Sequence, residues 1–155
     1  MTLASIANQF YDAGVQFGNY PASMTNQEFI QAIYRNVLGR PPGTPPSQGE
    51  INYWNYRLVS HQDSKGTMVL QMLSDVHTYF EGITDPNNPN YAFQFVSAHL
   101  NNKAYVANYY AVQQGLSMNV QADNVSFGIG LAALITPTDT TAAIALIGVN
   151  AFAVL

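Results

Sequence analysis

The chain has 155 residues, no cysteine and a net charge of −4, and only 9% of its residues are charged, against about 25% in an average globular protein. This length suits one domain with a sizeable core, the lack of cysteine excludes disulfides and thiolate metal sites, and the few scattered basic side chains argue against nucleic-acid binding. After Lys103 the only charged side chains are those of Asp123 and Asp139. Copies of the chain therefore repel one another little, and we expect the folded surface to associate readily.

The termini show no pattern of membrane insertion or of a cleaved signal. The first residues, MTLASIANQF, lack the basic start and following apolar stretch that a cleaved secretory signal requires. The apolar run from Ile144 to Leu155 is too short to cross a bilayer. We therefore predict a protein with no membrane insertion and no cleaved N-terminal signal.

Apolar residues at helical spacing begin near the N-terminus, where TLASIANQFYDAGVQF predicts a first helix. The next segment, TNQEFIQAIYRNVLG, carries signals for both helix ends. Thr25 and Glu28 form a capping-box pattern at its start. Gly39 suits the left-handed conformation at its end, and Pro41 prevents the helix from continuing.

The segment SQGEINYWNYRLVS repeats the capping-box pattern with Ser47 and Glu50 and places Trp54 on its apolar side. SKGTMVLQMLSDVHTYF predicts a third helix in this region. Beyond the turn-rich TDPNNPN, YAFQFVSAHLNN and KAYVANYYAVQQG predict two helices. ADNVSFGIGLAALI and TTAAIALIG predict two more, and NAFAVL leaves open a short extended C-terminal tail.

These patterns predict an all-α protein, a compact bundle of about six to eight short helices with hinges rich in proline and glycine. Residues 1–155 are expected to form a single domain. Within it, residues 24–82 are expected to form a three-helix core, and residues 91–155 a helical, nearly uncharged C-terminal subdomain.

No motif for catalysis stands out. The histidines His61, His77 and His99 are far apart in the sequence. We expect them at the surface or at helix ends, with no carboxylate at ligand spacing on the same helix. The nine acidic residues single out no acid–base pair, and the sequence has no nucleophile-elbow or phosphate-loop pattern. We predict that the protein is not an enzyme.

The loop TDPNNPN offers four oxygen-bearing side chains, those of Asp85, Asn87, Asn88 and Asn90. Oxygen ligands suit Ca²⁺, but the loop lacks the spacing, the central glycine and the terminal glutamate of an EF-hand. Turns in which Asp or Asn side chains bond the backbone explain the same residues without a metal. Both interpretations stay open, and no cofactor other than Ca²⁺ is expected.

Aromatic residues of the segment SQGEINYWNYRLVS suggest two roles. Tyr53 and Tyr56 suit stacking against a sugar, because their rings combine flat apolar area with a polar tip. Trp54 between them is expected in the core. We assign to the core and hinge Tyr34, Arg35, Leu38, Gly39, Arg40 and Trp54. The arginines are expected to bond backbone carbonyls or nearby acids.

The segments FIQAIYRNVLGRPP, INYWNYRLVS and MVLQMLSDVHTYF resemble the bacterial family called domain of unknown function 4214, with its motif Y-R-x-x-L-G-R-x-P followed by Y-W. The likeness covers residues 29–80, and NNKAYVANYYAVQQGL is similar to a segment that often follows this domain. The family linker usually carries Pro-Asp and a glycine where this chain has PPGTPPSQGE. A ligand role of that Asp therefore has no counterpart here.

The resemblance implies a setting among surface-layer, adhesin-like or calcium-repeat proteins exported by type I secretion. It implies an extracellular or cell-surface location, reached without a cleaved N-terminal signal. Our first hypothesis is a secreted structural protein that self-assembles into an extracellular filament or surface layer, with a role at the cell surface or in a biofilm matrix. The alternative is an extracellular carbohydrate- or cell-surface-binding module.

The two hypotheses name different partners. In the first the partner is the chain itself, and in the second it is a cell-surface glycan bound through Tyr53 and Tyr56. The residues assigned to the assembly interface are Leu3, Ile6, Phe10, Phe127, Leu131, Ile144, Phe152 and Leu155.

Overall fold

Seven α-helices make up most of the described chain. The computed structural model describes residues 1–40, 43–116 and 120–152, without the side chains of residue 121 and residues 149–152. The elements are α1 (Leu3–Gln16), α2 (Asn26–Asn36), α3 (Gln48–Val59), α4 (Lys65–Phe80), the 3₁₀ turn η1 (Tyr91–Phe93), α5 (Gln94–Asn108), the π-helical turn η2 (Tyr109–Gln113), α6 (Gln121–Ala133) and α7 (Thr141–Phe152). No strand occurs in these ranges, which confirms the all-α prediction.

The second half differs from the predicted helix boundaries in two places. α5 continues through Asn102 and Lys103, and η2 extends it to Gln113, so the two helices predicted there are one. No glycine or proline interrupts residues 94–113, which explains the continuity. α7 reaches Phe152, so the alternative of an extended tail is wrong up to that residue.

The helix ends follow local signals in the sequence. Both predicted capping boxes are present: the backbone N–H of Thr25 donates to Glu28 at 2.8 Å, and that of Ser47 donates to Glu50 at 2.7 Å. Matching boxes begin α1 and α4. Gly39 has a φ of +68° beyond the end of α2, a conformation that favours glycine. The predicted stop is therefore confirmed.

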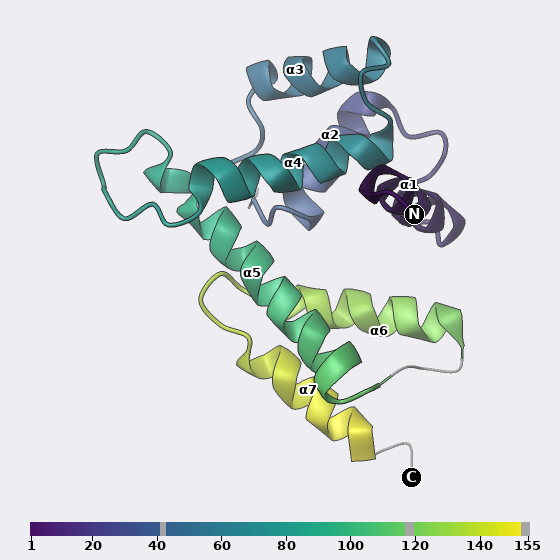
Figure 1. Ribbon diagram of the computed structural model, residues 1–155. Coiled ribbons are helices and arrows are strands. Elements are labelled where there is room, and N and C mark those ends of the chain that lie inside the picture. Colours follow the sequence, from purple (N-terminus) through teal and green to yellow (C-terminus); the bar gives the residue numbers. More distant parts are fainter. Residues whose placement is uncertain (41–42, 117–119, 153–155) are drawn as a thin grey trace.

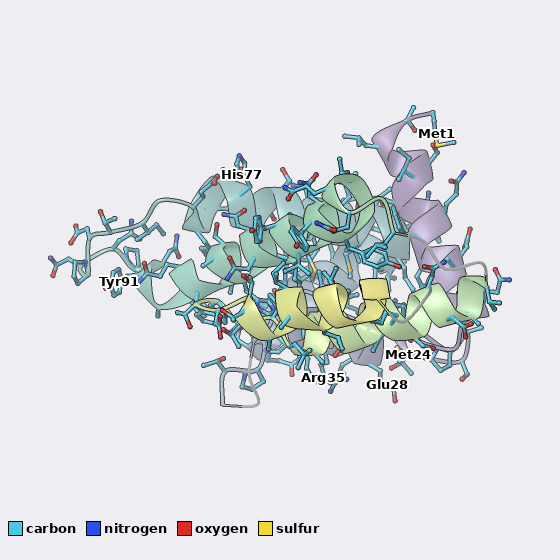
Figure 2. All side chains as sticks on the ribbon, turned by 90° about the horizontal axis from the view of Figure 1, so that it is seen from below. Met1, Met24, Glu28, Arg35, His77 and Tyr91 are labelled. Atoms are coloured by element: carbon cyan, nitrogen blue, oxygen red, sulfur yellow. The ribbon has the colours of Figure 1, made fainter. Side chains whose placement is uncertain are left out.

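The larger core lies among α2, α3, α4 and the start of α5. Its buried residues are Phe29, Ile30, Ile33, Tyr34, Leu38, Ile51, Trp54, Leu58, Met68, Met72, Val76 and Val96. Trp54 donates its Nε1–H to the Tyr34 hydroxyl at 3.0 Å, which satisfies a buried donor. α1 packs against one end of α4 and projects from the bundle, with Met1 at its free end (Figures 1 and 2).

A second, smaller core lies at the far end of α5. It is formed by Val106, Leu131, Ile135, Ala143 and Ile147 from α5, α6 with the residues just after it, and α7. α5 leads away from the first four helices toward α6 and α7 (Figure 1). One long helix therefore takes part in both cores.

Candidate functional site

An open groove with apolar walls runs between α1 on one side and α2 and α4 on the other. We call it the α1 groove, and it has a volume of about 360 Å³. Its lining residues are Leu3, Ile6, Ala7, Phe10, Tyr11, Tyr20, Phe29, Ile33, Val37, Gly66, Val69, Leu70 and Leu73, and none of them carries a charge. Leu3 is 70% exposed and Phe10 is 76% exposed, although both belong to the apolar side of α1.

α1 approaches α4 most closely where Ala7 and Asn8 meet Gly66, near the start of α4. A Cβ added to Gly66 would lie 2.6 Å from the carbonyl oxygen of Ala7, so the glycine permits the close approach of the two helices. Ser64 donates to Asn8 Oδ1 at 2.5 Å beside this contact. Lys65 donates to the carbonyl of Met24 at 3.1 Å. The contacts of Gly66 and Ser64 hold α1 and that of Lys65 holds the segment after it, yet no α1 residue is buried.

The structure brings together part of the predicted assembly set. Leu3, Ile6 and Phe10 all line the α1 groove. Leu131 is only 5% exposed inside the second core, so its assignment to a surface is wrong. The reason is that α6 packs this side against α5 and α7.

The other members of that set lie in the C-terminal part. Phe127 and Ile144 are half-buried against the second core. The Phe152 side chain and Leu155 lie outside the described residues. The C-terminal part instead exposes Val112, Val120, Ile129 and Leu134. Sequence periodicity could not predict the exposure of Ile129, because apolar residues occur all around α6.

The hinge between α2 and α3 is held by one buried arginine. Arg40 is 8% exposed, and it donates to the carbonyls of Thr44 at 2.9 Å and Pro45 at 3.1 Å. Its Nη1 forms an ion pair with Glu50 Oε1 at 2.6 Å. Bonds from an arginine to hinge carbonyls and to an acid are what the sequence predicted at this position. The segment joins two helices, and Arg40 and Glu50 also line a small pocket of about 180 Å³ beside it.

Comparison with known proteins identifies the N-terminal part. Residues 13–75 match the model of a family described as Domain of unknown function (DUF4214). These residues belong to the DUF4214 family. The comparison with curated proteins found no match, and neither did the comparison with solved structures.

The DUF4214 match extends from the last turn of α1 into α4, so it includes the α2 and α4 walls of the α1 groove and the whole Arg40 hinge, but not the groove-lining residues of α1. The suspected family is therefore confirmed, with a match that starts earlier and ends earlier than the predicted core of residues 24–82. Among the described residues, no helix is long and apolar enough to span a membrane.

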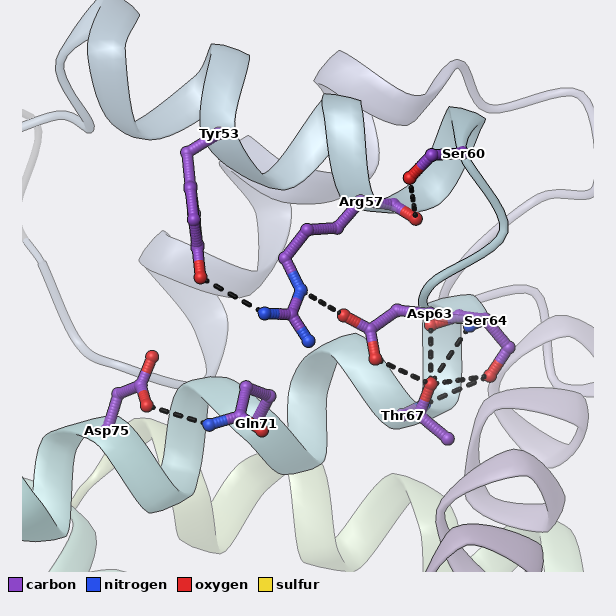
Figure 3. A network of polar contacts seen from close by, with 8 residues as sticks. All are labelled: Tyr53, Arg57, Ser60, Asp63, Ser64, Thr67, Gln71 and Asp75. Carbon is purple, nitrogen blue, oxygen red and sulfur yellow. Dashed lines mark hydrogen bonds and ion pairs between the residues drawn. The ribbon is translucent and has the colours of Figure 1, made fainter.

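The outer surface of α3 in the DUF4214 domain exposes both predicted tyrosines, Tyr53 and Tyr56. Tyr53 is partly engaged, because Arg57 donates to its hydroxyl at 3.1 Å. Arg57 also pairs with Asp63 at 2.5 Å, and Thr67 donates to the same carboxylate at 3.1 Å (Figure 3). The network ties the end of α3 to the start of α4. It therefore has a structural role, and Tyr56 remains the freer of the two rings.

The loop after α4 forms the turns that the sequence suggested. The backbone N–H of Asn87 donates to Asp85 Oδ1 at 2.9 Å, and that of Asn90 donates to Asn88 Oδ1 at 2.8 Å. These bonds account for two of the oxygen-bearing side chains without a metal. No group of three or more His, Cys, Asp or Glu side chains suited to a metal occurs in the described part of the chain. Calcium binding at this loop stays a prediction.

Two expectations about the histidines are wrong. His77 and Glu81 are four residues apart and form a contact of 2.5 Å at the exposed end of α4, so a carboxylate does accompany a histidine. His99 is 8% exposed in the middle of α5, where the long helix turns it toward Gly39. His61 lies beyond the end of α3 with a φ of +58°, as a helix-end residue.

The Glu50 carboxylate predicts a pH dependence of stability. Burial alone would raise the pKa of Glu50, but hydrogen bonds from Ser47 and Arg40 outweigh it and hold the pKa below its ordinary value. A lowered folded-state pKa stabilises the fold above the pKa of an unfolded glutamate, about 4.3. That contribution is lost as the pH falls through the folded-state pKa.

We therefore expect Glu50→Gln to lower the free energy of unfolding at pH 6 and to flatten its decline between about pH 5 and pH 3. Urea unfolding followed by circular dichroism across this range measures both effects. Subtracting the Glu50→Gln curve from the wild-type curve removes the contributions of the other carboxylates. Parallel curves for the two proteins would show that Glu50 has the same pKa folded and unfolded.

Proposed function

We propose that this protein is a secreted structural protein whose copies assemble end to end into an extracellular filament or layer. The observation that carries the proposal is the α1 groove, an open apolar surface with Leu3 and Phe10 exposed at its edge. Exposed apolar surface of this kind is costly in water and marks interaction sites. The secreted setting comes from the family resemblance.

The occupant that fits the groove is α6 of a second copy. A helix that enters an uncharged groove must not bury charge, and the only charged residue of α6 is Asp123 in its first turn. Leu134 is exposed just beyond the C-terminal end of α6. The helices of the DUF4214 domain fit less well, since each of α2, α3 and α4 carries charges.

This pairing uses two different surfaces of the molecule. A contact between unlike surfaces leaves one groove and one α6 free at the two ends of any dimer, so repetition gives an open chain unless a ring closes. The small number of charges lowers the repulsion between neighbouring copies. The unlike surfaces favour a polymer over a symmetric dimer, and the low charge favours association of either kind.

We expect Phe10→Ser to weaken self-association about tenfold or more, because an aromatic side chain that becomes buried in an interface contributes strongly to binding. Its exposure means that the monomer should keep its stability. Val59→Ser is the matched control, since Val59 is an exposed apolar residue at the end of α3, away from the groove. Light scattering and negative-stain microscopy measure the assemblies. Equal assembly by the two variants would contradict the role of the groove.

Because the chain has no cysteine, single cysteines can test which surfaces meet. Phe10→Cys protein mixed with Leu134→Cys protein should form disulfide-linked pairs on oxidation, and a Val59→Cys and Leu134→Cys mixture should form far fewer. Only contacts between copies link two single variants. Strong cross-linking of Phe10→Cys to itself, with none to Leu134→Cys, would replace the open chain with a symmetric dimer.

A second candidate, an extracellular carbohydrate-binding module, is favoured by the amides beside α3. Asn26, Gln27, Gln48, Asn52 and Asn55 line a shallow polar pocket, and Tyr56 lies one helical turn after Asn52. Amides beside an exposed aromatic ring suit sugar hydroxyls and a sugar face. A glycan array on the monomeric Phe10→Ser protein tests it. Binding that Tyr56→Ala removes would favour this candidate, and an array without binding would count against it.

A further inference from the structure

A second cleft lies between the DUF4214 domain and the C-terminal helices. It has a volume of about 580 Å³ and is separate from the α1 groove apart from Tyr20, which lines both. α2 and α5 contribute polar and basic side chains to it, and α6 with the residues just after it contributes apolar ones. The volume falls in the range of pockets that hold small molecules.

Two of the five basic residues of the chain line this cleft, and they are free of carboxylates. Arg40 and Arg57 each pair with an acid, whereas neither Arg35 nor Lys103 takes part in an ion pair among the described residues. Arg35 is exposed, and its Nε donates to Asn36 Oδ1 at 3.2 Å, which leaves the remaining guanidinium donors available. No acidic residue lines the cleft.

Lys103 is held in place by the end of α2. Its Nζ donates to the carbonyls of Asn36 at 2.8 Å and Val37 at 3.1 Å, so the ammonium lies at the negative end of the helix dipole. An ammonium has three donors, and one remains. Burial lowers the pKa of Lys103 below its ordinary value, and an anion nearby would oppose that shift.

The ring of His99 gives a second, independent indication that the cleft holds a bound molecule. Its ring lines the cleft, only 8% of the residue is exposed, and Nδ1 is buried without a hydrogen-bond partner in the described structure. Such an atom in a native protein points to a bound water or ligand that completes the bonding. Gly39 makes room for the ring, since a Cβ there would lie 2.5 Å from His99 Cδ2.

The opposite wall of the cleft, formed by α6 and the residues just after it, indicates the chemistry of the rest of the ligand. Ile129, Ala132, Ala133 and Ile135 carry no hydrogen-bonding side chain, and the alanines leave space beside α6. A ligand that fills the cleft therefore needs an apolar part. Arg35 offers one guanidinium, and the Lys103 ammonium already donates to two carbonyls. Together they match a ligand with one negative charge better than a phosphate dianion.

We infer that this cleft binds a small organic carboxylate, with its head group against Arg35 and Lys103 and its apolar part against α6. Such a ligand would contact the DUF4214 domain and the C-terminal helices at once. It would thereby stabilise their relative placement, because a ligand that binds only the folded arrangement favours it by mass action. The inference does not depend on self-assembly.

The test uses hexanoate as the probe and the Phe10→Ser protein, which keeps the cleft and removes the proposed assembly contact. Chemical-shift titration in heteronuclear NMR should show hexanoate binding with the largest changes at His99 and at the α6 residues named above. Acetate, which lacks the apolar part, and 1-hexanol, which lacks the charge, should each bind at least about tenfold more weakly, given that a hydrogen bond to a charged group contributes enough for such a ratio.

Variants separate the cleft from the α1 groove. Arg35→Gln should weaken hexanoate about tenfold, and Lys103→Gln should do so at least as strongly. Lys65→Gln is the matched control: it removes the same charge and a bond to a backbone carbonyl, but lies beside the α1 groove. Arg35 is exposed, so its variant folds even if Lys103→Gln disturbs the contact between α5 and α2.

Hexanoate should also raise the pKa of His99, since a nearby anion favours the imidazolium. The other titratable groups lining the cleft are Tyr20, Arg35 and Lys103. Titration of the His99 ring signals with and without hexanoate measures the shift. The inference is overturned if hexanoate does not bind, if 1-hexanol binds equally well, or if Arg35→Gln leaves the affinity unchanged.

Discussion

Arg40→Ala is expected to lower the free energy of unfolding by about 3 kcal/mol, because removing one partner of a buried ion pair typically costs 3–5 kcal/mol. Glu50, the partner, keeps about a third of its side chain exposed, which places the expected loss at the lower end. The change also removes hydrogen bonds to the carbonyls of Thr44 and Pro45.

The aromatic contacts of Arg40 add to this loss. Its guanidinium carbon lies 5.0 Å from the centroid of the Tyr34 ring and 4.8 Å from that of Phe93. One side chain thereby contacts α2, the hinge, α3 and the turn before α5. Arg40→Lys should recover little of the stability, because an ammonium cannot reproduce the fork of donors.

Urea unfolding followed by circular dichroism measures the effect. Arg35→Ala is the matched control: it is an arginine at the same helix end, exposed, with one bond to its neighbour. It should change the free energy of unfolding by no more than about 0.5 kcal/mol. If Arg40→Ala proved as stable as Arg35→Ala while a bound ligand was lost, the hinge would be a binding site and its structural assignment would fail.

Gly66→Ala is expected to destabilise the protein by about 1–3 kcal/mol, the usual cost of forcing extra atoms into a packed contact. The new Cβ would lie 2.6 Å from the carbonyl oxygen of Ala7 and from Asn8 Oδ1. Backbone atoms cannot rotate away, so α1 must move off α4. Since α1 forms one wall of the α1 groove, self-association should fall together with stability.

Gly49→Ala is an unusually close control. Gly49 and Gly66 both occupy the second position of a helix, two residues after a capping serine. A Cβ at Gly49 meets only Ser47 Oγ, at 3.8 Å. That substitution should raise stability by about 0.4–1 kcal/mol, because alanine restricts the unfolded chain.

Hydrogen exchange locates the damage. In Gly66→Ala the amides of α1 should lose protection first, while those of α2 and α3 keep most of theirs. If both glycine variants gained stability, the close approach of α1 to α4 would be absent in solution, and the α1 groove with it.

The features predicted correctly from sequence are those settled by neighbours along the chain. The capping boxes of Thr25 and Ser47 and the left-handed Gly39 require only residues within one helical turn. Arg40 bonds carbonyls four and five residues away and an acid ten residues away, so its role could also be predicted from the sequence. The residues that match the DUF4214 family include these local signals.

The candidate sites depend instead on contacts between distant segments. The residues around His99 have the composition of an exposed helix. His99 is buried only because α5 crosses the end of α2. Leu131 and Ile129 lie two residues apart on α6, where apolar residues occur on every side, so periodicity could not say which would face inward.

Length, charge and local signals in the sequence determined an all-α chain with capped helices, a DUF4214 domain and few charges to oppose association. Only the tertiary structure decided that α1 leaves Phe10 exposed beside a groove and that Arg35, His99 and Lys103 face one cleft. The physical reason is how far apart along the chain the interacting residues lie. Caps and stops are satisfied by hydrogen bonds within a turn, whereas a groove or a cleft exists only after helices far apart in the sequence have packed.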